Sequence, residues 1–250
     1  ADDDGCAGDG HGDGRDDVLT IEGGRVLARG VTGNLLWDTP NVLATRIEGA
    51  FDLNGDGERE LLLRRTASFA VLKLANGALI WESQLDVPME SLSSFHVTDL
   101  EGDGGKEVLI ADQAMNAGKP YLTGQVHVYS FLDGFENPFP RVSTELDTRD
   151  YEVGRSVTSA DLNGDGVEEI IVTGKRAVYA YSGTTGELIT GSNPDAFSQE
   201  TFLGMAELFV RDLDGDSRPE VIVMVNANFV GESSREAIVL ETTETDELQV

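Results

Sequence analysis

Short runs of β-type residues recur along the chain, with polar turns between them. One set consists of "VLTI", "LLLR", "VLIA", "IIVT" and "VIVM", and each is followed by a second run such as "FAVLKL" (69–74) or "AVYAYS" (177–182). Apolar runs of four to eight residues, rich in branched or aromatic side chains and bounded by turn residues, are typical of strands. No segment of helical length shows a 3.6-residue apolar period. The pattern predicts an all-β protein.

Two further strands complete each unit. "TGNLLWDT" (32–39) and "NGALIWES" (76–83) are near copies, and "TTGELITG" (184–191) is a weaker one, each with a glycine suited to a hairpin turn. A fourth run, such as "SFHVT" (94–98) or "LFVR" (208–211), precedes the first run of each unit after the first. Residues 1–8, "ADDDGCAG", make a poor strand. Four antiparallel strands are therefore expected in each unit.

An acidic motif lies before the first of these runs in every unit. Its copies are "DGHGDGRDDV" from Asp9, "DLNGDGEREL" from Asp52, "DLEGDGGKEV" from Asp99, "DLNGDGVEEI" from Asp161 and "DLDGDSRPEV" from Asp212. Successive copies start 43, 47, 62 and 51 residues apart. Four-stranded units repeated at this spacing predict a β-propeller, because such sheets bury their faces against one another.

We therefore expect a single propeller over residues 1–250, built from about five four-stranded antiparallel blades. The approximate repeats are 1–40, 41–88, 89–148, 149–198 and 199–250. The extra length of the third, at about residues 112–150, is interpreted as loop insertions. Three arrangements remain open: a closed five-bladed ring, an excerpt of a longer protein, and a protomer whose open edges pair with a neighbour.

The acidic motif has the composition of a calcium loop. Its positions 1, 5 and 9 are always acidic, position 3 is Asn, Glu, Asp or once His, and position 6 is usually glycine. Calcium takes six to eight oxygen ligands, and a backbone carbonyl at position 7 would supplement the side chains. A helix–loop–helix site needs Glu at position 12, which is Thr or an aliphatic residue here. A plain surface turn would not require acids at fixed positions.

The net charge favours cationic partners. Asp and Glu number 46 against 18 Lys and Arg, which gives a formal charge of −28. Nucleic acid and anionic lipid are poor partners for such a surface. The acidic loops explain part of the excess, and a solubilising surface explains it equally well. No apolar run approaches the 18 residues of a membrane-spanning helix, and the single cysteine, Cys6, excludes an intramolecular disulfide.

The string "VGRSVTSADLNGDGVEEIIVTG" (153–174) resembles an FG-GAP repeat, the blade unit of integrin α-subunit propellers. It is also similar to the VCBS/FG-GAP-like repeats of bacterial surface and secreted proteins. The resemblance implies that each loop joins the innermost strand of a blade to the next and binds calcium, with four to five ions in all. The chain departs from the family in having Glu at position 9 of four loops, Ser217 at position 6 of the last, and five repeats rather than seven or eight.

Carried over by position, the resemblance implies a ligand set of four side chains and one position-7 carbonyl per loop. The candidate metal ligands are Asp9, His11, Asp13, Arg15 and Asp17; Asp52, Asn54, Asp56, Glu58 and Glu60; Asp99, Glu101, Asp103, Gly105 and Glu107; Asp161, Asn163, Asp165, Val167 and Glu169; and Asp212, Asp214, Asp216, Arg218 and Glu220. His11 makes the first loop the weakest candidate, because calcium prefers oxygen ligands.

Two functions fit these features. The first is an extracellular or cell-surface calcium-binding module for adhesion, binding or structure, with a protein or carbohydrate partner and possible self-assembly. The alternative is a secreted polysaccharide lyase or hydrolase on a calcium propeller. His96 and His127 share no motif, His127 fits a strand, and no serine-hydrolase, zinc or phosphate-loop signature is present. We therefore assign no catalytic residue.

Aromatic residues divide into two groups. Trp37 and Trp81 occupy equivalent repeat positions, which favours packing between blades over stacking on a sugar. Tyr121, Phe135 and Phe139 lie in the insertions of the third repeat and are candidates for ligand contact. Long loops on a rigid scaffold commonly carry binding surfaces.

Overall fold

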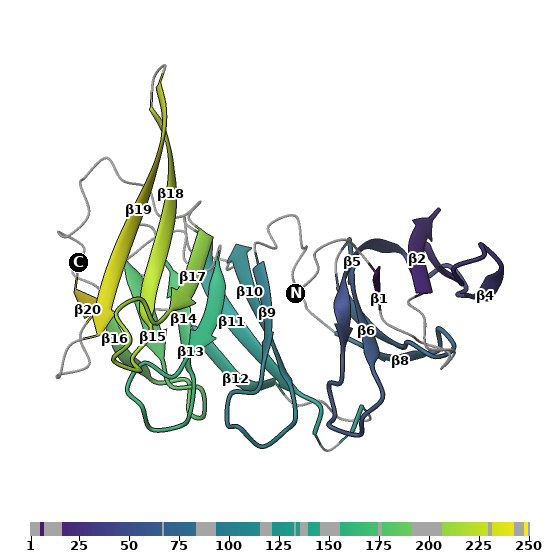
Figure 1. The fold of residues 1–250 in the computed structure, drawn as a ribbon, viewed down its shortest axis with the longest axis horizontal. Helices are drawn as coiled ribbons and strands as arrows, with labels where there is room; N and C mark the ends of the chain where they lie inside the picture. Colours follow the sequence, from purple (N-terminus) through teal and green to yellow (C-terminus); the bar gives the residue numbers. More distant parts are fainter. Residues whose placement is uncertain are drawn as a thin grey trace. The chain divides into compact units, whose positions relative to one another are not determined.

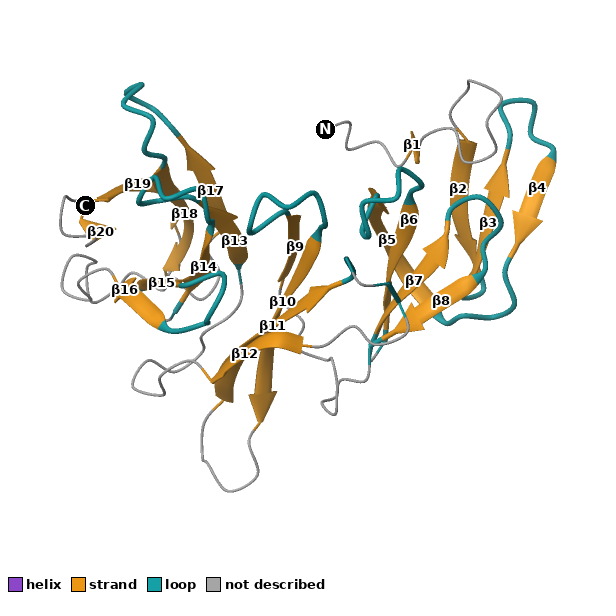
Figure 2. Ribbon diagram, turned by 90° about the horizontal axis from the view of Figure 1, so that it is seen from below, coloured by secondary structure: helices purple, strands orange, loops and turns teal. Residues whose placement is uncertain are grey.

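The computed structural model describes residues 6–7, 17–66, 68–83, 94–115, 122–132, 134–135, 140–145, 156–174, 177–191, 207–229, 232–242 and 248–249. Every regular element in this described part is a β-strand, from β1 to β20 (Figures 1 and 2). No helix with the length and apolarity to cross a membrane is found there. The expected all-β class is confirmed.

The strands form five four-stranded sheets, each from four consecutive strands paired antiparallel. The first sheet contains β1 (Cys6–Ala7), β2 (Asp17–Glu22), β3 (Arg25–Arg29) and β4 (Leu35–Asp38). The second contains β5 (Ala44–Phe51), β6 (Glu60–Arg65), β7 (Phe69–Lys73) and β8 (Leu79–Glu82). The third contains β9 (Ser94–Thr98), β10 (Glu107–Met115), β11 (Leu122–Ser130) and β12 (Pro140–Glu145). The fourth contains β13 (Val157–Ala160), β14 (Glu169–Thr173), β15 (Val178–Tyr181) and β16 (Leu188–Gly191). The fifth contains β17 (Glu207–Arg211), β18 (Glu220–Phe229), β19 (Glu232–Thr242) and β20 (Leu248–Gln249).

Two expectations about strand positions were wrong. The acidic N-terminal stretch does supply a strand, because Cys6 and Ala7 pair with the start of β2 through backbone bonds that need no apolar side chain. The stretch at about residues 112–150 is also partly strand rather than loop. There β10 runs on to Met115 and pairs with a β11 that begins at Leu122, while β12 starts at Pro140. Cross-strand pairing here outweighs the local preference of Gly and Pro for turns.

The chain divides into two compact units. The first unit comprises Ala1–Glu90 and Phe131–Pro138, and it holds the first and second sheets. The second comprises Ser91–Ser130 and Phe139–Val250, and it holds the third, fourth and fifth sheets. Within each unit, consecutive sheets pack face to face through an apolar core.

Alternate residues of β14, the second strand of the fourth sheet, enter different cores. In β14, Ile170 and Val172 pack with residues of the third sheet, whereas Ile171 packs with residues of the fifth. In the first unit, Leu61 and Leu63 of β6 pack with the first sheet. We call the face toward the previous sheet along the chain the preceding face, and the opposite one the following face. The two-residue period of a strand thus serves two cores at once.

Aromatic rings and serine hydroxyls add further packing contacts and hydrogen bonds within each unit. Trp37 lies on the core between the first two sheets, and the Cα of Gly77 approaches its ring so closely that a Cβ would lie 2.6 Å from it. This confirms the expected packing role of Trp37. Trp81 packs edge-to-face on Phe131, with ring centroids 5.1 Å apart. In the second unit, the Val157 N–H donates to Ser94 Oγ at 2.9 Å and the Leu208 N–H donates to Ser156 Oγ at 3.2 Å.

The leucine at position 2 of the acidic loop shows how far a sheet depends on its successor. Leu53, Leu100 and Leu162 are at most 2% exposed, but Leu213 of the fifth sheet is 54% exposed. Leu162 packs into the core that the fourth sheet shares with the fifth. Within the second unit, the leucine is therefore buried where a following sheet shares its core, as for Leu100 and Leu162, and exposed in the fifth sheet.

This difference gives a stability prediction. Leu162→Ala should lower the free energy of unfolding by about 2–4 kcal/mol, because it leaves a cavity in a packed core. Leu213→Ala should change it by less than about 0.5 kcal/mol, since little buried area is lost. Urea unfolding followed by far-ultraviolet circular dichroism measures both. Equal losses for the two variants would contradict the assigned packing.

Candidate metal centre

Each described acidic loop joins the first strand of a sheet to the second. The loops lie between β5 and β6, β9 and β10, β13 and β14, and β17 and β18, and the position-9 glutamate is the first residue of the second strand. The loop is therefore fixed at both ends by paired strands. Strand, loop and strand form one hairpin whose tip carries the charge.

The backbone turns tightly at loop positions 4 and 6. In the fourth sheet, Gly164 has a φ of 79° and Gly166 a φ of 88°. These values lie in the left-handed region, which glycine enters at little cost. In the fifth sheet position 6 is Ser217, and its φ of 74° keeps the same turn without glycine. The geometry of the turn is thus retained where the residue type is not.

Acidic side chains inside the loop accept hydrogen bonds from the turning backbone. In the fourth loop, Asp161 Oδ1 accepts from the Gly164 N–H at 2.7 Å and Oδ2 accepts from the Gly166 N–H at 2.9 Å. Asp165 Oδ1 accepts from the Val167 N–H at 2.8 Å. These bonds hold the carboxylates of Asp161 and Asp165 against the backbone of the turn.

The other described loops repeat this arrangement. The N–H at position 6 donates to the position-1 carboxylate from Gly57 at 2.9 Å, Gly104 at 2.9 Å and Ser217 at 3.1 Å. The N–H at position 7 donates to the position-5 carboxylate from Glu58, Gly105 and Arg218 at 2.7–3.0 Å. Four loops of different sequence therefore share the same set of backbone-to-carboxylate hydrogen bonds.

The position-9 glutamate has a structural role that the sequence did not indicate. Glu60, Glu107, Glu169 and Glu220 are all buried, and Oε2 of each accepts from the N–H of the position-2 leucine at 2.6–3.0 Å. One carboxylate oxygen thus closes the neck of the loop. The longer reach of Glu compared with Asp suits it to this bond, and in the fourth loop the other oxygen of Glu169 accepts from Asn163 Nδ2 at 3.3 Å.

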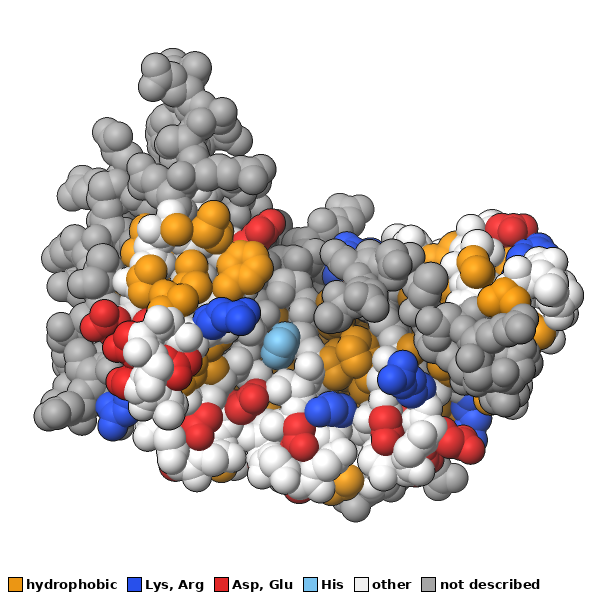
Figure 3. Space-filling view, in the orientation of Figure 1, with side chains coloured by type: hydrophobic (Ala, Val, Ile, Leu, Met, Phe, Trp, Pro, Cys, Tyr) orange, Lys and Arg blue, Asp and Glu red, His pale blue; other side chains and the backbone are white. Residues whose placement is uncertain are grey.

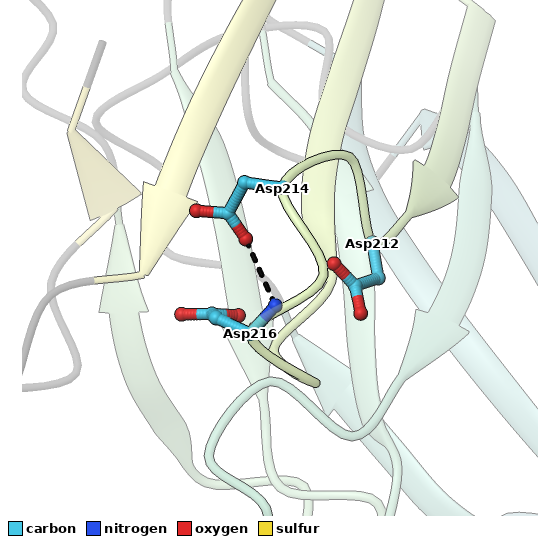
Figure 4. Close-up of side chains that lie close together, drawn as sticks. All are labelled: Asp212, Asp214 and Asp216. Atoms are coloured by element: carbon cyan, nitrogen blue, oxygen red, sulfur yellow. Dashed lines mark hydrogen bonds between the residues drawn. The ribbon is translucent and has the colours of Figure 1, made fainter.

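The candidate ligands come together to different degrees. Oxygens of Asp212, Asp214 and Asp216 all lie within 4.8 Å of one another (Figure 4), and these side chains are exposed. In the fourth loop, Asn163 Nδ2 donates to Asp165 Oδ2 at 3.2 Å and to Glu169 Oε1 at 3.3 Å. The fifth loop therefore brings together the acids at positions 1, 3 and 5, and the full ligand set stays a prediction.

The structure gives fewer contacts for the remaining candidate metal ligands. Asp9, His11, Asp13 and Arg15 lie outside the described residues. Asp17 is the buried first residue of β2, equivalent to the position-9 glutamates. Asp99, Glu101 and Asp103 belong to the third loop, where Asp99 accepts from the Asp103 N–H at 3.0 Å. The role of the position-7 carbonyls of Glu58, Gly105, Val167 and Arg218 stays a prediction.

The second loop holds an oxygen that lacks a donor. Asp52 Oδ1 is buried and has no hydrogen-bond partner, although Oδ2 accepts from the Gly57 N–H. A buried carboxylate oxygen without a partner is costly, so a bound cation would stabilise it. The residues present therefore fit a hard divalent ion.

Two acids of the second loop have pKa values shifted in opposite directions. Burial, together with the charges of Asp56 and Asp52, raises the pKa of Glu60 to about 7, although the hydrogen bond from the Leu53 N–H and the charge of Lys73 oppose the shift. Hydrogen bonds from the Asn54 side chain and the Glu58 N–H lower the pKa of Asp56. Without a cation, the loop thus keeps an outer carboxylate charged and tends to protonate the buried one.

Other candidate functional residues lie in strands or packed contacts. His127 lies in β11, which confirms its expected place in a strand, and burial lowers its pKa. His96 lies in β9, where burial lowers its pKa although Glu168 opposes the shift. Phe135 packs on Phe131 with ring centroids 5.2 Å apart, whereas Tyr121 and Phe139 fall outside the described residues.

The non-glycine residue at position 6 of the fifth loop gives a prediction. Ser217→Gly should raise the free energy of unfolding by about 0.5–1 kcal/mol, because the left-handed conformation costs a residue with a Cβ about 1–2 kcal/mol and glycine loses more entropy on folding. Gly166→Ser, the matched reverse change, should be destabilising by a similar amount. Thermal unfolding of both variants tests this, and a loss of stability in Ser217→Gly would contradict it.

Comparison with known families finds one match. The family model described as an FG-GAP-like repeat matches residues 161–223. This segment starts at position 1 of the fourth acidic loop and ends in β18, so it spans one loop and the next. No curated protein matches the chain.

Comparison with solved structures shows a similar fold. The crystal structure of the Vibrio cholerae biofilm matrix protein Bap1 aligns over 96% of this chain with a TM-score of 0.61 and 23% identity. The chain spans only 37% of that protein. BamB from Moraxella catarrhalis aligns over 92% of this chain and 74% of its own, with 14% identity and a TM-score of 0.34. The resemblance seen in the sequence is thereby confirmed for its best-preserved copy, and residues 161–223 carry an FG-GAP-like repeat.

Proposed function

We propose that this chain is a calcium-stabilised β-propeller segment that serves as an extracellular binding or structural module. The observation that carries the proposal is the set of backbone-to-carboxylate hydrogen bonds that the four described acidic loops share. Each holds carboxylate oxygens against the turning backbone through the same hydrogen bonds. A surface turn would gain nothing from repeating that arrangement with acids at positions 1, 5 and 9.

Calcium suits the donor set best. The side chains at positions 1, 3, 5 and 9 and a carbonyl at position 7 would hold the ion, and all of these are oxygen donors. Calcium accepts six to eight oxygens in flexible geometry, whereas magnesium demands near-octahedral geometry. When bound, the ion supplies positive charge at the centre of the carboxylates.

The charge supplied would add substantial stability. Two carboxylates about 5 Å apart repel by about 3 kcal/mol at an effective dielectric constant of 20. At free calcium about ten times the dissociation constant, each site contributes about 1.4 kcal/mol to folding. Several such sites are comparable with the stability of an ordinary domain, about 5–15 kcal/mol. The ions therefore act on the fold rather than on a reaction.

A propeller arrangement is supported by the way consecutive sheets pack. In the second unit, the fourth sheet packs one face on the third sheet and the other on the fifth, and in the first unit the two sheets pack on each other. Radial repetition of such sheets is how propellers bury both faces. We propose that the five sheets are successive blades of one propeller, in the order of the chain.

An extracellular place and a surface role rest on two supports. Extracellular calcium modules bind at about 10⁻⁴–10⁻³ M, which matches open loops with exposed ligands. The solved protein of similar fold is a biofilm matrix protein. The proposed partner is a protein or a carbohydrate at the cell surface, since the charge of −28 disfavours nucleic acid. Catalysis as a lyase or hydrolase would rest on the fold class alone.

Calcium binding is tested directly by titration. Isothermal calorimetry of the chelated protein should show calcium binding at several sites, and millimolar calcium should raise the melting temperature by several degrees. The double change Asp161→Asn with Asp165→Asn should remove one site. Glu187→Gln removes one charge from an exposed turn and should bind as many ions as the original chain. Absence of both heat and thermal shift would refute the metal centre.

The raised pKa of Glu60 predicts an unusual pH dependence of the ion-free protein. Because its folded pKa of about 7 exceeds its ordinary value of 4.5, the folded state binds more protons between these values. Stability in chelator should therefore fall as pH rises from 4.5 to about 7. Calcium should abolish this decline, since the ion favours the charged carboxylate.

Melting temperatures across that pH range, with and without calcium, measure the effect. Glu60→Gln should flatten the chelated profile while its amide oxygen still accepts from the Leu53 N–H. Glu58→Gln, an exposed neighbour in the same loop, should leave the profile unchanged. A chelated profile that rises with pH in the unsubstituted chain would show that Glu60 is not held protonated.

A further inference from the structure

A backbone hydrogen bond joins the third and fourth acidic loops, which belong to neighbouring sheets of the second unit. The N–H of Glu168, at position 8 of the fourth loop, donates to the carbonyl oxygen of Leu100, at position 2 of the third loop, at 2.8 Å. Figure 3 shows acidic side chains over the loops that follow β9, β13 and β17. Two of these candidate ion sites are therefore connected through the protein itself.

Side chains add to this connection. Glu168 Oε2 accepts from Thr98 Oγ1, on the last residue of β9, at 2.6 Å and from Ser159 Oγ, in β13, at 2.5 Å. Gly183, which follows β15, leaves room for the Glu168 carbonyl, because a Cβ there would lie 2.3 Å from that oxygen. Leu100 is 1% exposed and packs in the core between the third and fourth sheets. Hydrogen bonds and packing therefore hold Glu168 and Leu100 together.

The peptide groups in this contact belong to the candidate ion sites. The Glu168 N–H shares a peptide group with the Val167 carbonyl, the predicted position-7 ligand, and the next residue is Glu169, the predicted position-9 ligand. In the third loop, the Leu100 N–H donates to Glu107 Oε2 at 3.0 Å. Linked hydrogen bonds strengthen one another, because each polarises the group that they share. A cation on the Val167 carbonyl would therefore strengthen the bond to Leu100, and with it the closed form of the third loop.

The equivalent contact between the fourth and fifth loops lacks both of its donors. Position 8 of the fifth loop is Pro219, which has no N–H to donate. The residue at the place of Thr98 before the fourth loop is Ala160, which has no hydroxyl. The fifth loop nevertheless keeps the same backbone bonds to its position-1 and position-5 carboxylates. The second unit thus contains one pair of loops with this connection and one pair without it.

We propose that the third and fourth loops bind calcium cooperatively through the contact between Leu100 and Glu168, whereas the fourth and fifth loops bind it independently. The inference rests on the proposed function, because it requires that the loops bind cations. An ion in either loop of the connected pair raises the affinity of the other, and the effect is equal in both directions because coupling free energies are reciprocal. A hydrogen bond of ordinary net strength corresponds to a change in affinity of about three- to tenfold.

The backbone amide at position 6 reports on each loop separately, because its N–H donates to the position-1 carboxylate of its own loop. These amides belong to Gly104 in the third loop, Gly166 in the fourth and Ser217 in the fifth. Calcium is titrated into the chelated full chain, and the movement of each signal in a proton–nitrogen NMR correlation spectrum gives the dissociation constant of its loop. We expect all three signals to move.

Removing one site tests its effect on the loop before it. Asp161→Asn with Asp165→Asn disables the fourth loop and should weaken calcium binding by the third loop about three- to tenfold. Asp212→Asn with Asp216→Asn is the matched change in the fifth loop, and it should leave the affinity of the fourth loop within about twofold of the original. Both changes remove two charges from the same loop positions, so an effect of charge alone would appear at both interfaces.

Glu168→Pro separates the hydrogen bonds from mere proximity, because it copies the residue that the fifth loop already carries at position 8. In this variant, disabling the fourth loop should change the affinity of the third by no more than about twofold. Glu168→Ala is the control. It keeps the N–H and should retain a larger dependence of the third loop on the fourth than Glu168→Pro does.

The outcomes distinguish a failure of this inference from a failure of the proposed function. If no position-6 signal moves with calcium, both the metal centre and the cooperativity are refuted. If the signals move but the third loop binds calcium equally well with and without a functional fourth loop, the metal centre stands and the cooperativity is refuted. Equal weakening at both interfaces would also overturn the cooperativity, because it would show that the loops interact through charge alone.

Discussion

A buried carboxylate at the first residue of the second strand holds each acidic loop to its sheet. In four loops this glutamate accepts the N–H of the position-2 leucine through Oε2, and in the fourth loop Oε1 of Glu169 also accepts from Asn163 Nδ2. Burying a charged acid beside two or three others is unfavourable unless a proton or a cation compensates. The raised pKa of Glu60 favours compensation by a proton on that carboxyl group. The buried Asp52 Oδ1, which has no hydrogen-bond partner, could instead be compensated by a bound cation. Whether a proton or a cation compensates the buried charge depends on the pH and on the cation concentration.

The same bond couples the acidic loop, the candidate ion site, to the packing between sheets. Its donor is the backbone of the position-2 leucine, and the side chain of that leucine enters the core beneath the next sheet, as Leu162 does. The loop geometry that gathers oxygens on one side of the backbone therefore also aims an apolar anchor on the other. Because the N–H of Leu162 binds Glu169 and the side chain of Leu162 packs in the core, a change at the base of the loop should also affect the core. This explains why the acidic loop recurs with every sheet rather than at one site.

Much of this arrangement could be read from the sequence because it depends on local periods. Alternating apolar residues give the strands, and the fixed spacing of Asp161, Asp165 and Glu169 gives the loop. The bond from Glu169 to Leu162 could not be read, because it depends on where the second strand returns beside the first. The strand at Cys6–Ala7 and the long β10–β11 hairpin were missed because backbone pairing there overrides unfavourable residue types. Local sequence patterns therefore predict the strands and loops of each repeat, whereas the lengths of the strands depend on pairing with strands that are distant in the sequence.

Ion sites in such a chain differ according to what covers them. Asp52, Asp99 and Asp161 are half-buried at position 1 of their loops, whereas Asp212 is exposed, in the one described loop whose leucine is also exposed. Charges interact more strongly where water is excluded, so a cation gains more from a covered carboxylate than from an exposed one. The fourth loop has a buried Leu162 and a half-buried Asp161, whereas Leu213 and Asp212 of the fifth are both exposed. If the loops bind cations, the fourth loop should therefore hold its ion more tightly than the fifth.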